Sequence, residues 1–275
     1  MASDNPGLRE PEVRAVRQVA DRLVSYVQKF DSKDMERQTP CALWKVRDLV
    51  AHNISGVYGV TDSLNKIAKV EPTQGDDIHS QSQVNQQGVD AYRDRGDLLE
   101  LIGPAAQGVL DAYDRVAAAG KMDTEFDFFV KLTPRTLAAV LALDLSVHFW
   151  DYGRAKGETF LPDGTILADA FPPMLERVLP KTFEKDKAGN FFCTYGIKLT
   201  DIANGEWLIR IDRGDITVAR QPIARARVKI VSASHWFVLL SYGRIKPIPA
   251  LLTRKIKSKG NPLLARKFDT LFAKV

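Results

Sequence analysis

The sequence has few cysteines and no long apolar run. Its 275 residues include only two cysteines, Cys41 and Cys193, which lie far apart and form no closely spaced metal-binding pair. This usage is typical of a reducing compartment, although it does not exclude a single disulfide between the two cysteines. The first residues carry no apolar segment of a secretory signal. No stretch approaches the roughly 18–20 apolar residues of a membrane span. We therefore expect a cytoplasmic protein without a transmembrane segment.

Acidic residues are scarce in the last third of the chain. Residues 181–275 hold 19 Lys and Arg against 7 Asp and Glu, a net charge of +12. Residues 1–180 hold 20 against 27, a net charge of −7, so the overall charge of +5 conceals an asymmetry. Such a split predicts two domains with different surfaces. A basic surface attracts nucleic acid, anionic lipid or an acidic ligand, and a solvated surface without any partner is an equal alternative. We expect no nucleic-acid partner, because an RNA-binding aromatic signature and a helix-turn-helix spacing are both absent.

Helical periodicity dominates the chain up to about residue 180. The composition, 45% apolar and 27% charged, is typical of a soluble globular protein long enough for two ordinary domains. Apolar residues at helical spacing predict five regions. These are an amphipathic helix from Pro11, a second helix from residues 44–46, a third region over 81–119 interrupted at Gly103–Pro104, a long helix from Pro134, and a shorter helix over Ile166–Leu179.

The hydrophobic period changes to two beyond residues 181–190. Trp207, Ile209 and Ile211 alternate with more polar positions and predict a strand, which turns into a second strand near residue 216. Residues 228–231 predict a third strand, and two helices follow over 232–243 and 261–274. In the last helix we expect five apolar side chains to be buried: Leu263, Leu264, Phe268, Leu271 and Phe272. The predicted fold is α+β in two domains, a helical domain over 1–183 and a smaller α+β domain over 184–275.

Asp144 and His148 stand four residues apart in the long helix predicted from Pro134. Positions i and i+4 share one face of a helix, and this face also carries apolar residues, so both polar side chains should point toward the core. Buried charges are usually paired or bound to a metal. His52 also faces the apolar side of its predicted helix, and two imidazoles with a carboxylate suit zinc with open positions. The spacing of Asp144 and His148 alone fits equally well with a hydrogen-bonded pair in the core that binds no metal.

Two stretches carry recognisable motifs. Thr39–Gly56 reads TPCALWKVRDLVAHNISG, and Leu143–Ala155 reads LDLSVHFWDYGRA. Both resemble signatures of the mycothiol-dependent maleylpyruvate isomerase family, which belongs to the DinB-like four-helix metalloenzymes. Residues 204–272 resemble the sterol carrier protein type two-like fold. The resemblance implies a DinB-like four-helix bundle followed by a sterol-carrier-like domain.

The resemblance also implies a metal site and a reaction. The family's zinc ligands carry over to His52, Asp144 and His148, with Asp144 in place of the family's typical glutamate. The implied cosubstrate is mycothiol, a low-molecular-weight thiol, whose thiolate form is the nucleophile and is favoured by coordination to a metal. Thiolate addition to an activated double bond, rotation and elimination give cis–trans isomerisation. Capture without elimination gives S-transfer to the electrophile, and the sequence does not choose between the two.

Further acidic and basic residues are candidates for the site. Asp151, three residues after His148, is a catalytic candidate that would orient the imidazole, and Asp48 is its counterpart four residues before His52. A helix-surface salt bridge is the alternative for each acid. Arg154 and Arg47 are candidates to bind a substrate carboxylate or the cosubstrate. The family's second domain contributes an arginine, for which the candidates by region are Arg220, which we select, Arg225 and Arg227.

Three alternatives stay open at this point. One is a degenerate family member in which Asp144 no longer supports metal binding and the protein serves another step. The second domain could make the protein a non-enzymatic carrier of a lipid or another apolar ligand, which a large apolar tunnel would indicate. The metal site could instead activate water in a hydrolase, which would turn over without any thiol. The cysteine of the first motif, Cys41, is expected to be a buried and inert thiol.

Overall fold

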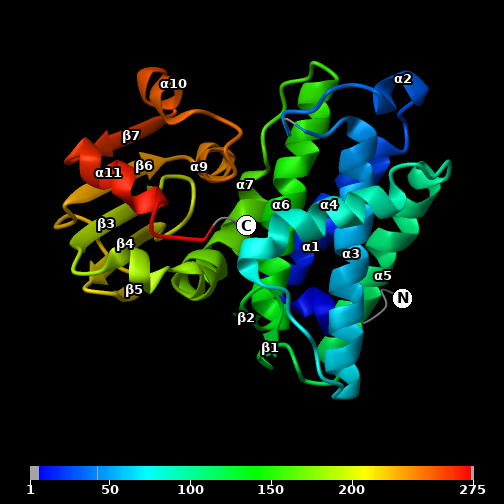
Figure 1. Cartoon of the computed structure of the whole chain (residues 1–275), viewed down its shortest axis with the longest axis horizontal. Coiled ribbons are helices and arrows are strands. Elements are labelled where there is room, and N and C mark those ends of the chain that lie inside the picture. The colour runs from blue at the N-terminus through cyan, green and yellow to red at the C-terminus, as the bar shows by residue number, and fades with distance from the viewer. Residues whose placement is uncertain (1–5, 42, 274–275) are drawn as a thin grey trace. The chain divides into compact units, whose positions relative to one another are not determined.

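The structure is a computed structural model that describes residues 6–41 and 43–273. The chain divides into two compact units, Met1–Ala170 and Phe171–Val275. The first is helical and the second contains a five-stranded sheet (Figure 1). This confirms the predicted α+β class with a helical domain first. The sequence predicted the domain boundary after residue 183, which is C-terminal to this division after Ala170. That boundary stays a prediction.

Four long helices form the N-terminal unit. Neighbouring pairs in the bundle are α1 with α6, α6 with α3, α3 with α5, and α5 with α1. The helix predicted from Pro11 is confirmed, with Pro11 at its first position and its apolar stripe buried. The bounds of the four helices are α1 (Pro11–Val27), α3 (Val46–Lys69), α5 (Leu98–Ala118) and α6 (Pro134–Ala155).

The interruption predicted at Gly103–Pro104 is wrong. Helix α5 continues through both residues, and the break lies between α4 (Gln81–Tyr92) and α5. Proline removes one backbone hydrogen bond from a helix interior, but the buried neighbours Ile102 and Ala105 hold this turn in the core of the bundle. Packing therefore outweighs local propensity at Pro104.

Short elements complete the N-terminal unit. The segment between α5 and α6 contains a two-stranded antiparallel ribbon, which was not predicted from the sequence. The helix expected over Ile166–Leu179 is present as α7, which is followed by the short π-helix η3 and the short 3-10 helix η4. The bounds in this unit are η1 (Pro6–Arg9), α2 (Ser32–Met35), η2 (Ile78–Ser80), β1 (Phe126–Asp127) and β2 (Lys131–Leu132). Helix α7 (Gly164–Pro173) extends past the division at Ala170, and η3 (Met174–Val178) and η4 (Leu179–Thr182) belong to the C-terminal unit.

The C-terminal unit is built on one five-stranded sheet in the order β5-β4-β3-β6-β7. The central pair β3 and β6 is parallel, and the other pairs are antiparallel. The three predicted strands are confirmed as β4, β5 and β6, whereas β3 and the edge strand β7 were not predicted. The strand bounds are β3 (Phe192–Leu199), β4 (Glu206–Asp212), β5 (Asp215–Arg220), β6 (Val228–Ser232) and β7 (Ile256–Lys259).

Four short helices accompany this sheet: α8 (Lys185–Ala188), α9 (Ser234–Ser241), α10 (Pro247–Leu252) and α11 (Pro262–Asp269). The expected burial of Leu263 is wrong, since this residue is 76% exposed, whereas Leu271 is fully buried. Helix α11 ends at Asp269, so the helical periodicity used to place Leu263 does not extend to Leu271. Within the described part of the chain, no helix combines the length and hydropathy needed to cross a bilayer.

Candidate metal centre

The face of α6 that carries Asp144, His148 and Asp151 places an imidazole between two carboxylates. His148 Nε2 lies 3.4 Å from Asp144 Oδ2, and His148 Nδ1 lies 3.2 Å from Asp151 Oδ2. Spacings of four and three residues bring these side chains onto one helical face. Asp151 and His148 are buried, whereas the Asp144 side chain is 32% exposed. The two ring nitrogens of His148 therefore face different environments.

Helix α3 adds His52 to this site. The rings of His52 and His148 lie 5.1 Å apart between centroids, at 80° to one another. One ligand atom from each of His52, Asp144 and His148 lies within 4.8 Å of the other two. Two ligands of a tetrahedral zinc at about 2.0–2.2 Å from the ion are about 3.3–3.6 Å apart, and the 3.4 Å between His148 Nε2 and Asp144 Oδ2 matches that separation. The donor set suits a divalent metal.

The loop before α3 is held by Thr39, which is buried. Thr39 Oγ1 donates to the carbonyl oxygen of Trp44 at 2.6 Å and accepts from the backbone N–H of Cys41 at 3.2 Å. The backbone N–H of Trp44 donates to the carbonyl oxygen of Cys41 at 2.8 Å. These bonds hold Cys41 and Trp44 in place ahead of the helix that carries His52.

Both fixed side chains contact the site. The Trp44 ring lies 4.7 Å from the His52 ring between centroids, and Trp44 Nε1 donates to Gln86 Oε1 of α4 at 3.1 Å. Cys41 Sγ lies 3.3 Å from Asp151 Oδ2 and donates to it. Cys41, expected to be a buried and inert thiol, is half-buried and takes part in the environment of His148. Cys41 and Trp44 both belong to the TPC-x-x-W motif. From the sequence, however, neither residue was assigned a role at the metal site.

The electrostatics of the site favour a positive charge on His148. Burial alone would lower the pKa of His148, but the charge and hydrogen bond of Asp144, the hydrogen bond of Asp151 and the contact with Cys41 together outweigh it. The pKa of His148 is therefore raised well above its ordinary value. Two acids around one imidazole require a compensating cation, and a divalent ion on the Nε2 side can take the place of the proton.

Comparison with known proteins identifies the family. Residues 16–153 match the model of the mycothiol maleylpyruvate isomerase N-terminal domain. The chain belongs to the mycothiol-dependent maleylpyruvate isomerase family. Residues 175–273 match the SCP-2 sterol transfer family, which confirms the resemblance of the second domain. No curated protein sequence matches the chain.

Two solved structures are similar in fold to this chain. The first is the mycothiol-dependent maleylpyruvate isomerase, with a TM-score of 0.58, 11% identity, and coverage of 86% of this chain and 89% of that one. The second is the H52A mutant of a mycothiol-dependent maleylpyruvate isomerase, with a TM-score of 0.59, 10% identity, and coverage of 85% and 88%. At such low identity the likeness establishes the shared fold.

Other candidate residues of the N-terminal unit have partners of their own. Asp48 accepts from the backbone N–H of Lys45 at 2.9 Å and pairs with Arg93 at 2.9 Å, so it caps α3 and forms a salt bridge. Arg47 Nη1 lies 3.5 Å from Glu36 Oε1. The structure thus brings together His52, Asp144, His148 and Asp151, and gives Arg47 a different partner.

Arg154 is exposed near the end of α6. Its Nη1 lies 3.5 Å from the carbonyl oxygen of Glu158, and its guanidinium lies 5.9 Å from the centre of the Trp150 ring. These contacts are weak and leave the side chain exposed to solvent. Its assignment to catalysis stays a prediction.

The candidate arginines of the C-terminal unit lie on and after β5. Arg220 Nε lies 3.6 Å from Glu176 Oε1, and its guanidinium lies 4.9 Å from the centre of the Trp207 ring. Arg225 and Arg227 are exposed in the loop that leads to β6. Among these three, Arg220 has the best-defined position, and its role in cosubstrate binding stays a prediction.

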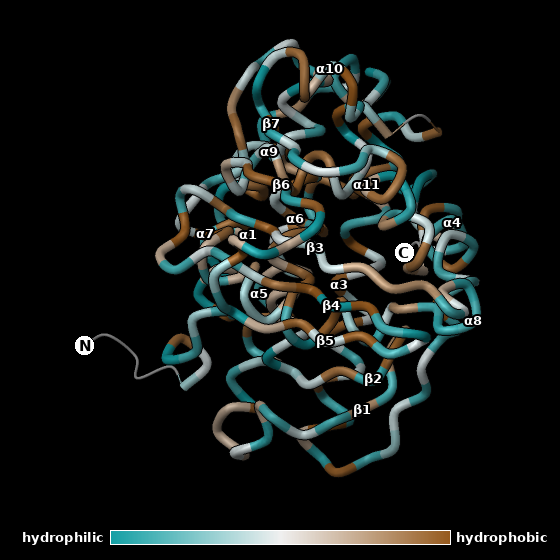
Figure 2. Tube along the Cα trace, turned by 90° about the vertical axis from the view of Figure 1, so that its left-hand side faces the viewer, coloured by the Kyte–Doolittle hydropathy of each residue, from teal (hydrophilic) through white to brown (hydrophobic). Residues whose placement is uncertain are grey.

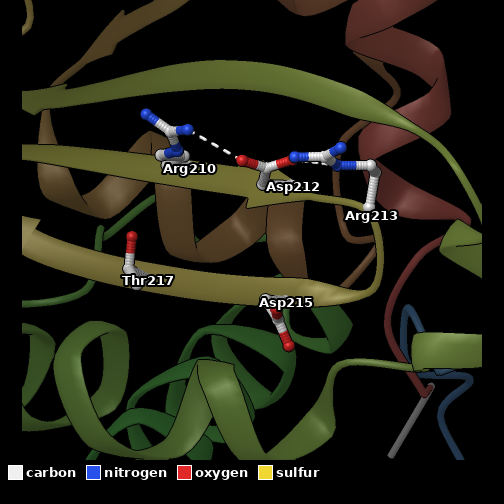
Figure 3. A pocket seen from close by; sticks show the side chains of 5 residues that line it. All are labelled: Arg210, Asp212, Arg213, Asp215 and Thr217. Carbon is white, nitrogen blue, oxygen red and sulfur yellow. Dashed lines mark hydrogen bonds and ion pairs between the residues drawn. The ribbon is translucent and has the colours of Figure 1, made fainter.

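A surface pocket on the C-terminal sheet is charged rather than apolar. Figure 3 shows its lining at the β4–β5 hairpin, where Arg210 and Arg213 both pair with Asp212, at 2.7 and 3.0 Å. The remaining lining residues are Asp215 and Thr217. A carrier of lipid needs an apolar cavity, and this pocket is not one.

Proposed function

We propose that this protein is a zinc-dependent isomerase of the maleylpyruvate isomerase type that uses a mycothiol-type thiol as its cosubstrate. His52, Asp144 and His148 would hold the metal. The observation that carries the proposal is the convergence of their three ligand atoms within 4.8 Å, from two helices of a bundle that belongs to this family. Side chains from facing helices of a bundle commonly build such metal sites.

The aspartate at position 144 is compatible with this role. Asp144 and His148 are one helical turn apart, and the 3.4 Å between their facing atoms already equals the separation of two zinc ligands. The shorter acid therefore needs no change in the backbone of α6 to share an ion with His148. With three protein ligands, a fourth position stays available to an exogenous group, as in other catalytic zinc sites.

Asp151 would position the first imidazole. With His148 Nδ1–H donating to the buried carboxylate of Asp151, the ring is held in the tautomer whose Nε2 lone pair faces Asp144 and His52. A carboxylate behind a metal-binding histidine also makes the imidazole a stronger donor. We infer that Asp151 orients His148 and does not itself bind the metal.

Trp44 would position the second imidazole. Its ring covers His52, and its own orientation is fixed by the hydrogen bond to Gln86. His52 and Asp144 are both half-buried, so the candidate site has a partly exposed side on which a thiol and a substrate could enter. Arg47 and Arg154 stay proposed as cations for a substrate carboxylate, because a guanidinium binds a carboxylate through paired hydrogen bonds.

Zinc at this position would keep a coordinated thiol in its thiolate form at neutral pH. The thiolate would add to an activated double bond of an unsaturated acid, the resulting single bond would rotate, and the same carbon–sulfur bond would then break. The products are the trans isomer and the unchanged thiol. If elimination does not follow, the same addition is S-transfer, and the proposed site supports either outcome.

The test is turnover of maleylpyruvate and related cis-unsaturated acids by the zinc-loaded protein, with and without added thiol, followed by NMR. We expect isomerisation that requires both zinc and thiol, and that is lost in His52→Ala but kept in His79→Ala, which alters an exposed histidine of η2. Accumulation of a thiol adduct would indicate S-transfer. Turnover without any thiol would instead support a hydrolase and overturn the proposal.

A further inference from the structure

Helix α10 presents an apolar face to solvent. Ile248, Leu251 and Leu252 are 72%, 42% and 79% exposed, whereas the small residue Ala250 is buried. The three large residues stand at positions i, i+3 and i+4, so they lie on one side of the helix. A surface helix normally turns its large apolar residues inward, and α10 does the opposite. Isolated apolar residues on a surface are common, but a grouped set calls for a partner.

Basic residues surround this helix. Lys246 precedes α10, Arg254 and Lys255 follow it, and Lys257 and Lys259 lie on the edge strand β7, against which α10 packs (Figure 1). All of these except the half-buried Lys255 are exposed. The sequence contains no acid between Asp215 and Asp269, so the local positive charge is not offset along the chain.

The combination of charge and apolar side chains distinguishes among possible partners. Lysines on an edge strand discourage pairing with another sheet, which explains β7 but not the leucines of α10. A second copy of the chain could cover the apolar face, but the same basic residues would then face each other. An anionic surface with an apolar interior matches both features at once. In Figure 2 the apolar residues of α10 stand out in brown beside hydrophilic neighbours.

We propose that α10, together with Lys246, Arg254, Lys257 and Lys259, is a docking surface for membranes that contain anionic phospholipid. Ile248, Leu251 and Leu252 enter the boundary between headgroups and acyl chains, and the basic side chains contact lipid phosphates. Because the apolar face is small, binding is peripheral, reversible and sensitive to salt. The surface would bring the C-terminal domain to a membrane independently of the metal centre.

The experiment measures binding of the full chain to vesicles of phosphatidylcholine alone and of phosphatidylcholine with phosphatidylglycerol, by sedimentation. We expect binding to the anionic vesicles only, and loss of binding as salt is raised. The combined change Ile248→Ser, Leu251→Ser and Leu252→Ser should weaken it more than about tenfold. The combined change Lys246→Gln, Arg254→Gln and Lys257→Gln should weaken it about 100-fold, at about fivefold for each charge.

Matched controls alter equally exposed residues of the N-terminal unit. The apolar control combines Val70→Ser and Leu161→Ser, and the charge control combines Lys29→Gln, Lys33→Gln and Lys69→Gln. Both controls should bind as the unchanged chain does. Equal binding to the two kinds of vesicle, no binding to either, or equal losses in the controls would overturn the proposal. A dimer in solution that the apolar triple change dissociates would assign the face to a second copy instead. The salt dependence uses the unchanged chain and needs no variant to fold.

Discussion

Two aspartates flank the same histidine of α6, and they differ in almost every other respect. Asp144 lies 3.4 Å from His148 Nε2, on the side of His52, and its side chain is 32% exposed. Asp151 lies 3.2 Å from His148 Nδ1, on the side of Cys41, and it is fully buried. One carboxylate is partly open to solvent. The other is enclosed with its hydrogen-bond partners.

This difference teaches how one helix can provide a ligand and the group that orients a ligand. Spacings of three and four residues place acids on both sides of an imidazole without any loop. In the proposed metal site, burial would decide the role of each acid, because a buried carboxylate is fixed by its hydrogen bonds, whereas a half-exposed one can bind an exchangeable ion. Substitutions at His148, which both acids share, and at each acid separate the Asp144 side from the Asp151 side.

The largest effect is expected from His148→Ala, which removes the group between the two acids. Both carboxylates lose their shared partner, and we expect zinc uptake to be abolished, a loss greater than the roughly 10–100-fold typical of an outer-shell change. Metal content after dialysis against zinc, measured by elemental analysis, provides the test. His79→Ala is the matched control and should retain about one zinc per chain. Full zinc content in His148→Ala would show that the ion binds elsewhere.

Changes at Asp144 test the ligand side. Asp144→Asn keeps the size of the side chain but removes its charge, so zinc affinity and thiol-dependent activity should both fall by at least about 100-fold. Asp144→Glu introduces the acid typical of the family and should retain the metal. Competition with a colorimetric chelator measures both affinities. Full occupancy in Asp144→Asn would show that the carboxylate is not a required ligand.

The sequence was informative about this site because its geometry is local. The i, i+4 relation of Asp144 and His148 follows from helical periodicity alone, and Asp151 was named as an acceptor from its i, i+3 spacing to His148. His52 comes from another helix, so periodicity predicted only its inward orientation, and the family resemblance was needed to favour a shared site with His148. Asp48 has the same spacing to His52 as Asp144 has to His148, yet it caps α3 and pairs with Arg93. Spacing does not reveal which partner an acid will find.

Changes at Asp151 test the orienting side. Asp151→Asn removes the charged acceptor behind His148, so zinc affinity should fall by about 10–100-fold, less than for the loss of a ligand. In the metal-free protein the pKa of His148 should also fall, because the hydrogen bond of Asp151 helps to raise it. NMR titration of the His148 ring measures this shift. An unchanged pKa together with unchanged zinc affinity would assign Asp151 a purely structural role.

Non-local structure accounts for most of what the sequence did not predict. Strand β3 alternates buried residues at Cys193, Tyr195, Ile197 and Leu199, but its parallel partner β6 lies about 30 residues further along the chain. Such pairing leaves little local signal. The exposed apolar face of α10 was missed because Pro247–Leu252 is too short and too apolar to show a polar side. Similarly, the role of Cys41 depends on a loop meeting α6 more than 100 residues later.

The smallest effect is expected at Cys41, the outermost member of the Asp151 side. Its thiol donates to Asp151 at 3.3 Å, and a neutral hydrogen bond contributes about 0.5–1.5 kcal/mol. Because a thiol is a weak donor, Cys41→Ala should weaken zinc binding only about threefold, whereas Cys41→Ser keeps a donor and should stay close to the unchanged chain. Asp151→Asn combined with Cys41→Ala should weaken binding no further than Asp151→Asn alone, since Cys41 would act only through that carboxylate. If the two losses instead multiply, Cys41 contacts the metal or the substrate directly, and the separation between an orienting side and a ligand side of His148 no longer holds.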